Sequence, residues 1–314
     1  MTPGDPSPSR GAPAAAPLRT RDQESDAEDH AAGLDHGVEC HMEWTRRLLR
    51  VAARGDAPTD DIVGPDAHER CAFGLWMAAQ REWCEGVDED AAARAFASHR
   101  DMHDAAGAIA AACGHGRPPD AALHDRFEAE QRTLYASLSR IKTLALARAA
   151  HRDALTGLAT RQALGIEVDR TWRIARRRGH DVAVLLIDVD HFKEVNDTHG
   201  HPVGDRTLQE IARALAACAR AGEPVLRYGG EEFLVLLIAA GLPSAAIAGH
   251  RFLDAVRSSA ASAAAARGPV TASGGLALMD GPDGVAEAIE RADRALYRAK
   301  RAGRDRLCWG NEPA

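Results

Sequence analysis

The chain has 314 residues, enough for about two domains, and its net charge of −7 argues against a general nucleic-acid or acidic-membrane binder. Hydrophobic residues make up 45% and charged residues 27% of the chain, as in ordinary globular proteins. No apolar run is long enough to span a membrane and no signal peptide is visible, so we expect a cytoplasmic protein. Its six cysteines are then expected to be free thiols or metal ligands.

The first half of the chain divides into a polar tail and a helical region. Residues 1–28 are rich in Pro, Ala, Ser and charge, which predicts a disordered tail. From 29 to 148 the pattern is helical, with helices predicted up to residue 54, over 65–83 and over 89–113. A long fourth helix follows, whose apolar residues are spaced three and four apart: Leu134, Leu138, Ile141 and Ala145. Short connections predict an antiparallel four-helix bundle.

Three of these helices carry residues that bind metals in proteins. His41 lies on the first helix, Cys71 near the start of the second, and His99 and His103 share one face of the third. Three imidazoles and one thiolate can close a tetrahedral site around Zn²⁺. Taken singly, a histidine pair or a buried cysteine more often has a packing role, and Cys40 is a competing ligand, about a quarter turn from His41.

The pattern in this region resembles the chemoreceptor zinc-binding domain of bacterial signalling proteins. The resemblance covers about residues 33–146 and rests on His41 with Trp44, on Cys71-x-Phe-Gly-x-Trp76, and on the pair His99 and His103. It implies the zinc ligand set His41, Cys71, His99 and His103.

The second half, 149–314, contains a run of apolar residues that ends in acids. Residues 182–187 are all aliphatic, which predicts a central strand buried on both faces, and Asp188 follows directly. A carboxylate at the end of such a strand is costly to hold unless it faces a site or a metal.

Two adjacent acids lie in a predicted hairpin turn between two apolar strands. Gly229 and Gly230 leave room for a ligand near the backbone, while Glu231 and Glu232 offer oxygen ligands for Mg²⁺. The alternative is a tight hairpin with a solvated acidic turn.

Further groups suited to a nucleotide surround these acids. Lys193 offers a point charge for phosphate, and Asn196 with Asp205 can match the Watson–Crick edge of guanine. Lys300 and Arg304 lie near a helix end, where they could equally be surface cations that complement the helix dipole.

Together these segments resemble the GGDEF family of diguanylate cyclases over about residues 150–310. The resemblance rests on six ordered motifs: Asp153-x-Leu-Thr-Gly-Leu, Asp188-x-Asp-x-Phe-Lys193, Asn196-Asp197, Gly200-His201-x-x-Gly-Asp205, Gly229-Gly-Glu-Glu-Phe233, and Ala292-Asp293-x-Ala-Leu-Tyr-x-Ala-Lys300 with Arg304. It implies a nucleotidyl-cyclase-like domain, in which helices flank a sheet that contains antiparallel strands.

The family condenses two GTP molecules into cyclic di-GMP and two pyrophosphates. The resemblance implies two Mg²⁺ ions per half-site, held by Asp188, Glu231 and the Val189 carbonyl, with Glu232 as the second acid of the signature. It assigns the catalytic set Glu231, Glu232 and Lys193. It assigns guanine to Asn196 and Asp205, and the rest of the nucleotide to Phe192, Gly229, Gly230, Lys193, Lys300 and Arg304.

The two-fold symmetry of the product implies a homodimer, for which the long fourth helix is a candidate stalk. From the domain order we expect zinc in the bundle to regulate the cyclase by inhibiting it. The competing function is a non-catalytic sensor of GTP or cyclic di-GMP. Arg220 and Glu223 occupy the positions of an Arg-x-x-Asp product-inhibition site of the family, with glutamate in place of aspartate.

Overall fold

The computed structural model describes residues 22–259, 261 and 270–310. It divides into two compact units, a helical unit that ends at Arg152 and an α/β unit that begins at Asp153. Among the described residues, no helix combines the length and the apolar character needed to cross a lipid bilayer.

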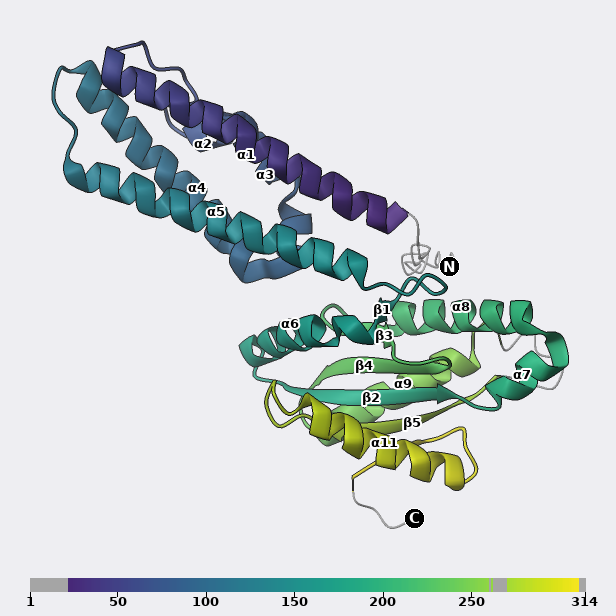
Figure 1. Cartoon of the computed structure of the whole chain (residues 1–314). Coiled ribbons are helices and arrows are strands. Elements are labelled where there is room, and N and C mark those ends of the chain that lie inside the picture. The colour runs from purple at the N-terminus through teal and green to yellow at the C-terminus, as the bar shows by residue number, and fades with distance from the viewer. Residues whose placement is uncertain (1–21, 260, 262–269, 311–314) are drawn as a thin grey trace, which may run out of the picture. The chain divides into compact units, whose positions relative to one another are not determined.

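The helical unit is built from three long helices and a shorter, broken leg (Figure 1). The long helices are α1 (Asp22–Arg54), α4 (Arg81–Gly114) and α5 (Ala121–Ala150), and the short leg consists of α2 (Ala67–Arg70) and α3 (Ala72–Ala79). The predicted seam of α5 is confirmed, because Leu134, Leu138, Ile141 and Ala145 are all buried in the core of this unit.

Two details of the helical prediction are wrong. α1 begins at Asp22, so residues 22–28, expected to be disordered, are helical; residues 1–21 lie outside the described part. The segment has no large apolar residue and therefore resembles a coil in composition, which is only a weak guide to where a helix begins. The second helix is also interrupted, since Cys71 has an extended backbone and caps α3.

α4 contains a break at Asp88, whose backbone is non-helical at φ −153° and ψ 100°. Its buried carboxylate accepts a hydrogen bond from Ala91 N at 3.0 Å and so caps the part of the helix that follows. The second carboxylate oxygen accepts from Nε of Arg140 on α5 at 2.8 Å. Asp88 therefore caps the third predicted helix, which was expected to begin at residue 89, although α4 also includes the helical residues before the break, from Arg81.

The α/β unit is organised by a six-stranded sheet in the order β1-β3-β4-β2-β5-β6. The strands are β1 (Ala159–Thr160), β2 (Asp181–Val189), β3 (Val225–Arg227), β4 (Glu232–Ala239), β5 (Ala272–Leu278) and β6 (Leu307–Trp309). β2 pairs antiparallel with both β4 and β5, which confirms the predicted central strand, and β3 and β4 form the predicted hairpin.

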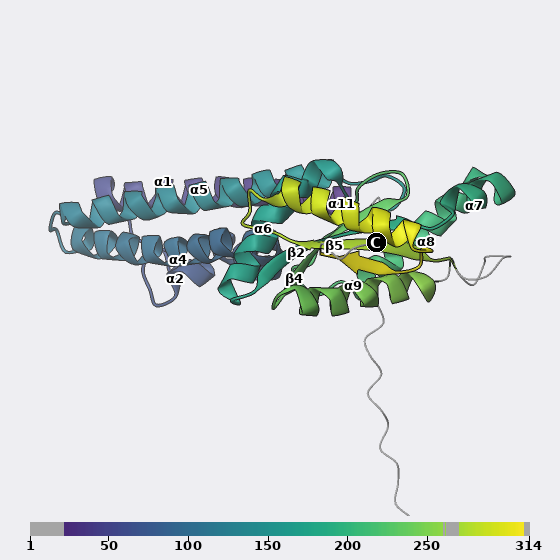
Figure 2. The same cartoon turned by 90° about the horizontal axis from the view of Figure 1, so that it is seen from below.

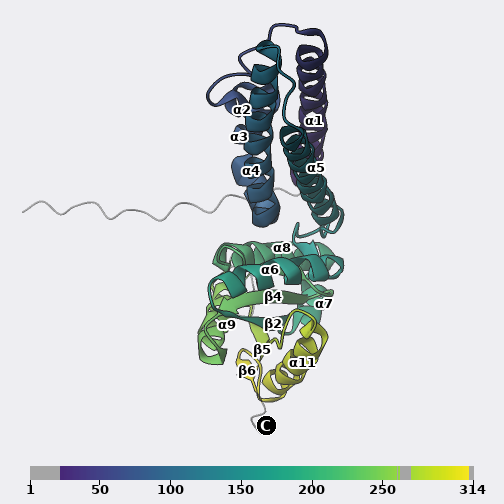
Figure 3. The ribbon, with the colours of Figure 1, turned by 90° about the vertical axis from the view of Figure 1, so that its left-hand side faces the viewer.

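Helices cover both faces of this sheet, with α9 and α11 on opposite sides (Figure 3; Figure 2 gives a second view). α8 (His201–Cys218) and α9 (Leu242–Arg257) pack on one face, and α6 (Leu164–Arg177) and α11 (Val285–Arg301) on the other; α7 (Phe192–His199) precedes α8. Odd-numbered residues of β2 face α8 and α9, whereas even-numbered ones face α6 and α11. This alternation directs Asp188 toward the α11 face.

Candidate active site and candidate metal centre

The acids of the candidate active site meet where β2 ends beside the β3–β4 turn. The register pairs Asp188 of β2 with Glu232 of β4, and directly opposed residues of antiparallel strands project to the same face. Glu231 precedes β4, and its carbonyl accepts a hydrogen bond from Val189 N at 3.3 Å. The sequence assigned the metal to Asp188, Glu231 and the Val189 carbonyl, and the register adds Glu232 as a further candidate ligand.

Two carboxylates and one ammonium interact where β2 ends. Burial raises the pKa of Glu232, and the nearby negative charge of Asp188 raises it further, whereas the positive charge of Lys300 lowers it. The Lys300 ammonium, on the last turn of α11, contacts Asp188 Oδ2 at 2.7 Å. Carboxylates that repel each other, next to a backbone carbonyl, are hard donors that fit Mg²⁺, which takes its remaining ligands from water and phosphates.

One guanidinium holds the turn that carries the glutamates. Arg227 Nη1 donates to both carboxylate oxygens of Asp153, at 2.8 and 3.0 Å. Its Nε and Nη2 donate to the Gly230 carbonyl at 3.2 and 2.9 Å. Burial alone raises the pKa of Asp153, but hydrogen bonds from Thr156 and Arg227 bring it below its ordinary value. The turn is thus fixed to the first residue of the α/β unit, a link that sequence reasoning missed.

Asp153 binds Arg227 of β3 rather than the nearby Arg161, which has another partner. The Arg161 guanidinium lies over the ring of Tyr228, with 4.8 Å between the carbon and the ring centre. Both contacts therefore brace the strand that leads into the glycine turn.

The two predicted guanine ligands lie on neighbouring helices that approach closely. A Cβ added to Gly204 of α8 would lie 1.9 Å from Asn196 Oδ1 of α7, and 3.2 Å from Cζ of the buried Phe192. Only glycine leaves room for the amide here. Asp205 follows Gly204 directly on α8, so both predicted guanine ligands belong to the region where α7 and α8 approach each other.

The predicted phosphate ligands come from three places in the unit. Lys193 is exposed on the first turn of α7, Lys300 lies on α11, and Arg304 lies in the loop after α11. Arg304 has a left-handed backbone at φ 62°, and its N–H donates to the Ala299 carbonyl at 3.0 Å.

The α/β unit matches a family model described as "Diguanylate cyclase, GGDEF domain" over residues 150–306, half of the chain. The chain belongs to the GGDEF family of diguanylate cyclases. It is 29% identical over 282 residues to diguanylate cyclase DgcZ of Escherichia coli K12, which covers 89% of this chain and 93% of that protein. It is 42% identical over 159 residues to diguanylate cyclase DgcP of Pseudomonas aeruginosa, where the match covers 49% of this chain and 23% of that larger protein.

Among solved structures, the cyclase resembles diguanylate cyclase SiaD of Pseudomonas aeruginosa, determined in complex with its activator SiaC. The identity is 30% and the TM-score 0.50, with 86% of this chain and 99% of that chain covered. The similarity to DgcZ and SiaD therefore extends through the helical unit, whereas the match to DgcP covers about half of the chain.

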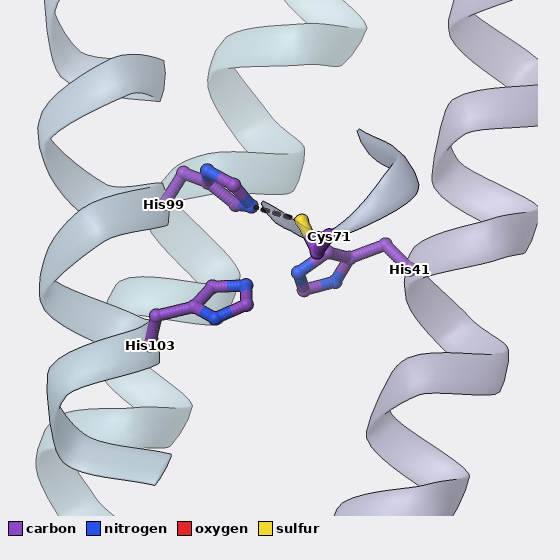
Figure 4. A group of neighbouring side chains, drawn as sticks. All are labelled: His41, Cys71, His99 and His103. Carbon is purple, nitrogen blue, oxygen red and sulfur yellow. Dashed lines mark hydrogen bonds between the residues drawn. The ribbon is translucent and has the colours of Figure 1, made fainter. Parts of the chain in front are cut away.

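The four candidate zinc ligands of this cyclase converge inside the helical unit (Figure 4). His41 comes from α1, Cys71 from the cap of α3, and His99 and His103 from α4, and their ligand atoms all lie within 4.8 Å of one another. All four residues are between 1% and 3% exposed. Cys71 Sγ lies 3.4 Å from His99 Nε2, while neither ring nitrogen of His41 or His103 has a hydrogen-bond partner.

Buried polar atoms without partners are costly unless a ligand completes them. Burial lowers the pKa of His41 to about 4, and burial with neighbouring imidazoles lowers the pKa of His99 to about 2 and of His103 to about 3. The rings are therefore neutral at pH 7, as metal ligands must be. Burial raises the pKa of the Cys71 thiol, whose proton a metal would displace. Three imidazoles and one thiol fit Zn²⁺.

Two other side chains near these four residues, Cys40 and His68, could compete as metal ligands but do not belong to the group. Cys40 lies outside it, with its Sγ 3.6 Å from Nε2 of His36. His68, which sequence reasoning missed, is half-buried on α2, and its ring centre is 6.2 Å from that of His99. A Cβ at Gly74 would lie 1.8 Å from the His68 carbonyl oxygen, so the Phe-Gly pair of the motif allows this close approach.

The two residues of the possible product-inhibition site, Arg220 and Glu223, already hydrogen-bond within the cyclase unit. The Glu223 side chain is buried and accepts hydrogen bonds from Arg220 N at 2.9 Å and from Arg251 at 3.3 Å. Arg251, on α9, has no sequence signal that links it to Glu223. A ligand at this site would therefore have to compete with the two groups that already hydrogen-bond to the Glu223 carboxylate.

Proposed function

We propose that this protein condenses two GTP molecules into cyclic di-GMP and two pyrophosphates, under the control of zinc in its helical unit. The observation that best supports catalysis is the cross-strand pair Asp188 and Glu232 beside the Gly229-Gly230 turn. Intact acids beside that turn favour an enzyme over a non-catalytic sensor of GTP or cyclic di-GMP.

Each residue then has a defined task. Asn196 and Asp205 bind guanine, while Lys193, Lys300 and Arg304 bind the triphosphate. Asp188 and Glu231, with the Val189 carbonyl, hold Mg²⁺ ions, and Glu232 lies close enough to share them. Bound Mg²⁺ would lower the pKa of the ribose 3′-hydroxyl and offset phosphate charge.

The reaction forms one bond and breaks another at each α-phosphate. The 3′-oxygen of one GTP attacks the α-phosphorus of the second, the hydroxyl proton leaves to solvent or a base, and pyrophosphate departs. The contact between Lys300 and Asp188 supports a role for this ammonium beside the metal ligands, where it would stabilise the departing pyrophosphate. Because the product is two-fold symmetric, two half-sites must meet, and we propose a homodimer that brings them together.

The zinc ligands are connected to the end of α5 by contacts within the helical unit. His99 and His103 lie on α4 beyond the break at Asp88, where Arg140 of α5 binds. Arg148 of α5 donates to the Val87 carbonyl at 2.8 Å. A shift of α4 on zinc binding would thus reach the last turn of α5, which leads directly into the cyclase unit. We propose that zinc inhibits by this route.

The test is GTP turnover by the purified protein with Mg²⁺, after treatment with a zinc chelator and after reloading with zinc. Glu232→Gln is the control for catalysis and His103→Ala the control for zinc. Cyclic di-GMP production that rises on chelation and does not respond to zinc in His103→Ala supports the proposal. GTP binding without product in every state indicates a sensor, and equal turnover in both states indicates that zinc is structural.

A further inference from the structure

Asp190 is a buried carboxylate that the proposed reaction does not use. It follows the candidate metal ligands Asp188 and Val189 on the chain and is 5% exposed. Its Oδ1 accepts a hydrogen bond from Ser273 Oγ at 2.7 Å, and its Oδ2 accepts from Thr271 Oγ1 at 2.8 Å. A buried carboxylate is expensive to maintain, and these hydroxyls offset only part of that cost.

The remaining partner of this carboxylate lies in the loop after α11. Oδ2 of Asp190 also accepts the backbone N–H of Asp305 at 3.0 Å, across 115 positions of sequence. Asp305 directly follows Arg304, a proposed triphosphate ligand. The bond therefore joins the strand end that carries the proposed magnesium ligands to the loop that carries a phosphate ligand.

The loop needs such an anchor because its backbone is strained. Arg304 and Asp305 have φ of 62° and 49°, in the left-handed region that side-chain-bearing residues seldom occupy. Consecutive residues of this kind persist only where the surrounding structure holds them. The Arg306 carbonyl accepts Gly274 N at 2.9 Å, and Arg257 binds the Asp305 side chain at 2.7 Å. Asp190 holds the backbone between these contacts.

We propose that Asp190 is a positioning residue that fixes the backbone of Arg304 for the triphosphate of GTP. This inference rests on the proposed function, since it takes Arg304 to bind phosphate. It predicts that replacing Asp190 weakens GTP binding through Arg304 and through no other ligand.

The hydrogen bonds of Asp190 define a rescue. In Asp190→Asn, the amide oxygen can take the place of Oδ2 and accept from Thr271 and Asp305, while the amide nitrogen donates to the Ser273 hydroxyl. Asp190→Ala removes every one of these bonds. Thr271→Val is the matched control, because it removes one bond to Oδ2 and leaves the contact with Asp305.

The experiment measures the dissociation constant for a GTP analogue with a methylene bridge between the α- and β-phosphates, in the full chain with Mg²⁺. We expect it to rise about tenfold in Asp190→Ala, as in Arg304→Ala, and to change less than about twofold in Asp190→Asn and Thr271→Val. The double variant Asp190→Ala, Arg304→Ala should bind no more weakly than Arg304→Ala alone.

Two results would overturn the inference. One is a double variant whose dissociation constant rises by the product of the rises in the two single variants. The other is a lowered melting temperature in Asp190→Ala with unchanged affinity for the analogue. If Asp190→Ala does not fold, Asp190→Glu replaces it, because the added methylene displaces the oxygens from Asp305 and should also weaken binding. Failure of the unmodified protein to bind the analogue would instead refute the proposed function itself.

Discussion

Replacing Gly204 by alanine gives a sharp test of the nucleotide pocket. Alanine is normally favoured over glycine in a helix, by about 0.5–1 kcal/mol. At Gly204, however, the new Cβ would lie 1.9 Å from Asn196 Oδ1, so the amide must rotate away. Gly165, on α6, is the matched control, because a Cβ there has nothing within 4 Å.

The expected magnitudes differ for folding and for substrate. A displaced rotamer costs roughly 0.5–1.5 kcal/mol, which cancels or slightly exceeds the helix gain, so stability should change little. Loss of one amide contact with guanine costs roughly 0.5–1.5 kcal/mol, which raises KM for GTP about twofold to twelvefold. Gly165→Ala should gain stability and leave KM unchanged.

The assay is urea unfolding combined with initial rates of pyrophosphate release over a range of GTP concentrations. Gly204→Ala should match Asn196→Ala in KM, and the double variant should show no further rise. Because truncation of Asn196 removes the collision, Gly204→Ala should stabilise the Asn196→Ala background. Unchanged KM in Gly204→Ala, or two effects that multiply in the double variant, would refute this account of the pocket.

Three further outcomes follow from the described contacts. Zinc at about 100 times its Kd should stabilise the protein by roughly 2.7 kcal/mol, which melting curves would show for His124→Ala but not for His103→Ala. Arg227→Lys keeps the charge but cannot reach Asp153 and the turn carbonyl together, so turnover should fall about tenfold, while the exposed Arg213→Lys does not change it. In metal-free protein, three buried histidines have pKa values lowered to between about 2 and about 4, so their neutral forms favour folding. That stability is complete above pH 6.5 and should fall below it by up to roughly 1.4 kcal/mol per histidine and pH unit, measured by urea unfolding with a chelator; a flat profile would contradict it.

The sequence predicted those features whose signal is local. The aliphatic run 182–187, the seam of α5 and the glycine turn each reveal a strand, a helix or a hairpin within a few residues. β1 and β6 have two and three residues, too few to show a period, and they form only because longer strands lie beside them. The break at Cys71 was missed because helical composition continues through it.

Candidate ligands and the groups that contact their neighbours differ in the same way. Asp188, Asn196 and Lys300 belong to short motifs, so the sequence alone can propose them as ligands. Arg227 contacts Asp153 across 74 positions, and Asp190 contacts Asp305 across 115. No window of sequence contains both partners of these bonds, and the choice of partner depends on the completed sheet.

The two candidate metal sites differ in chemistry, and the difference separates two explanations of any zinc effect. The helical unit offers three nitrogens and one sulfur, which prefer Zn²⁺, whereas the cyclase unit offers carboxylate and carbonyl oxygens, which suit Mg²⁺. Zinc could nevertheless inhibit by replacing Mg²⁺ at Asp188. Inhibition through the helical unit requires His103 and is insensitive to added Mg²⁺. Inhibition at the carboxylates persists in His103→Ala and is relieved by excess Mg²⁺, so the same variant and one titration distinguish the two routes.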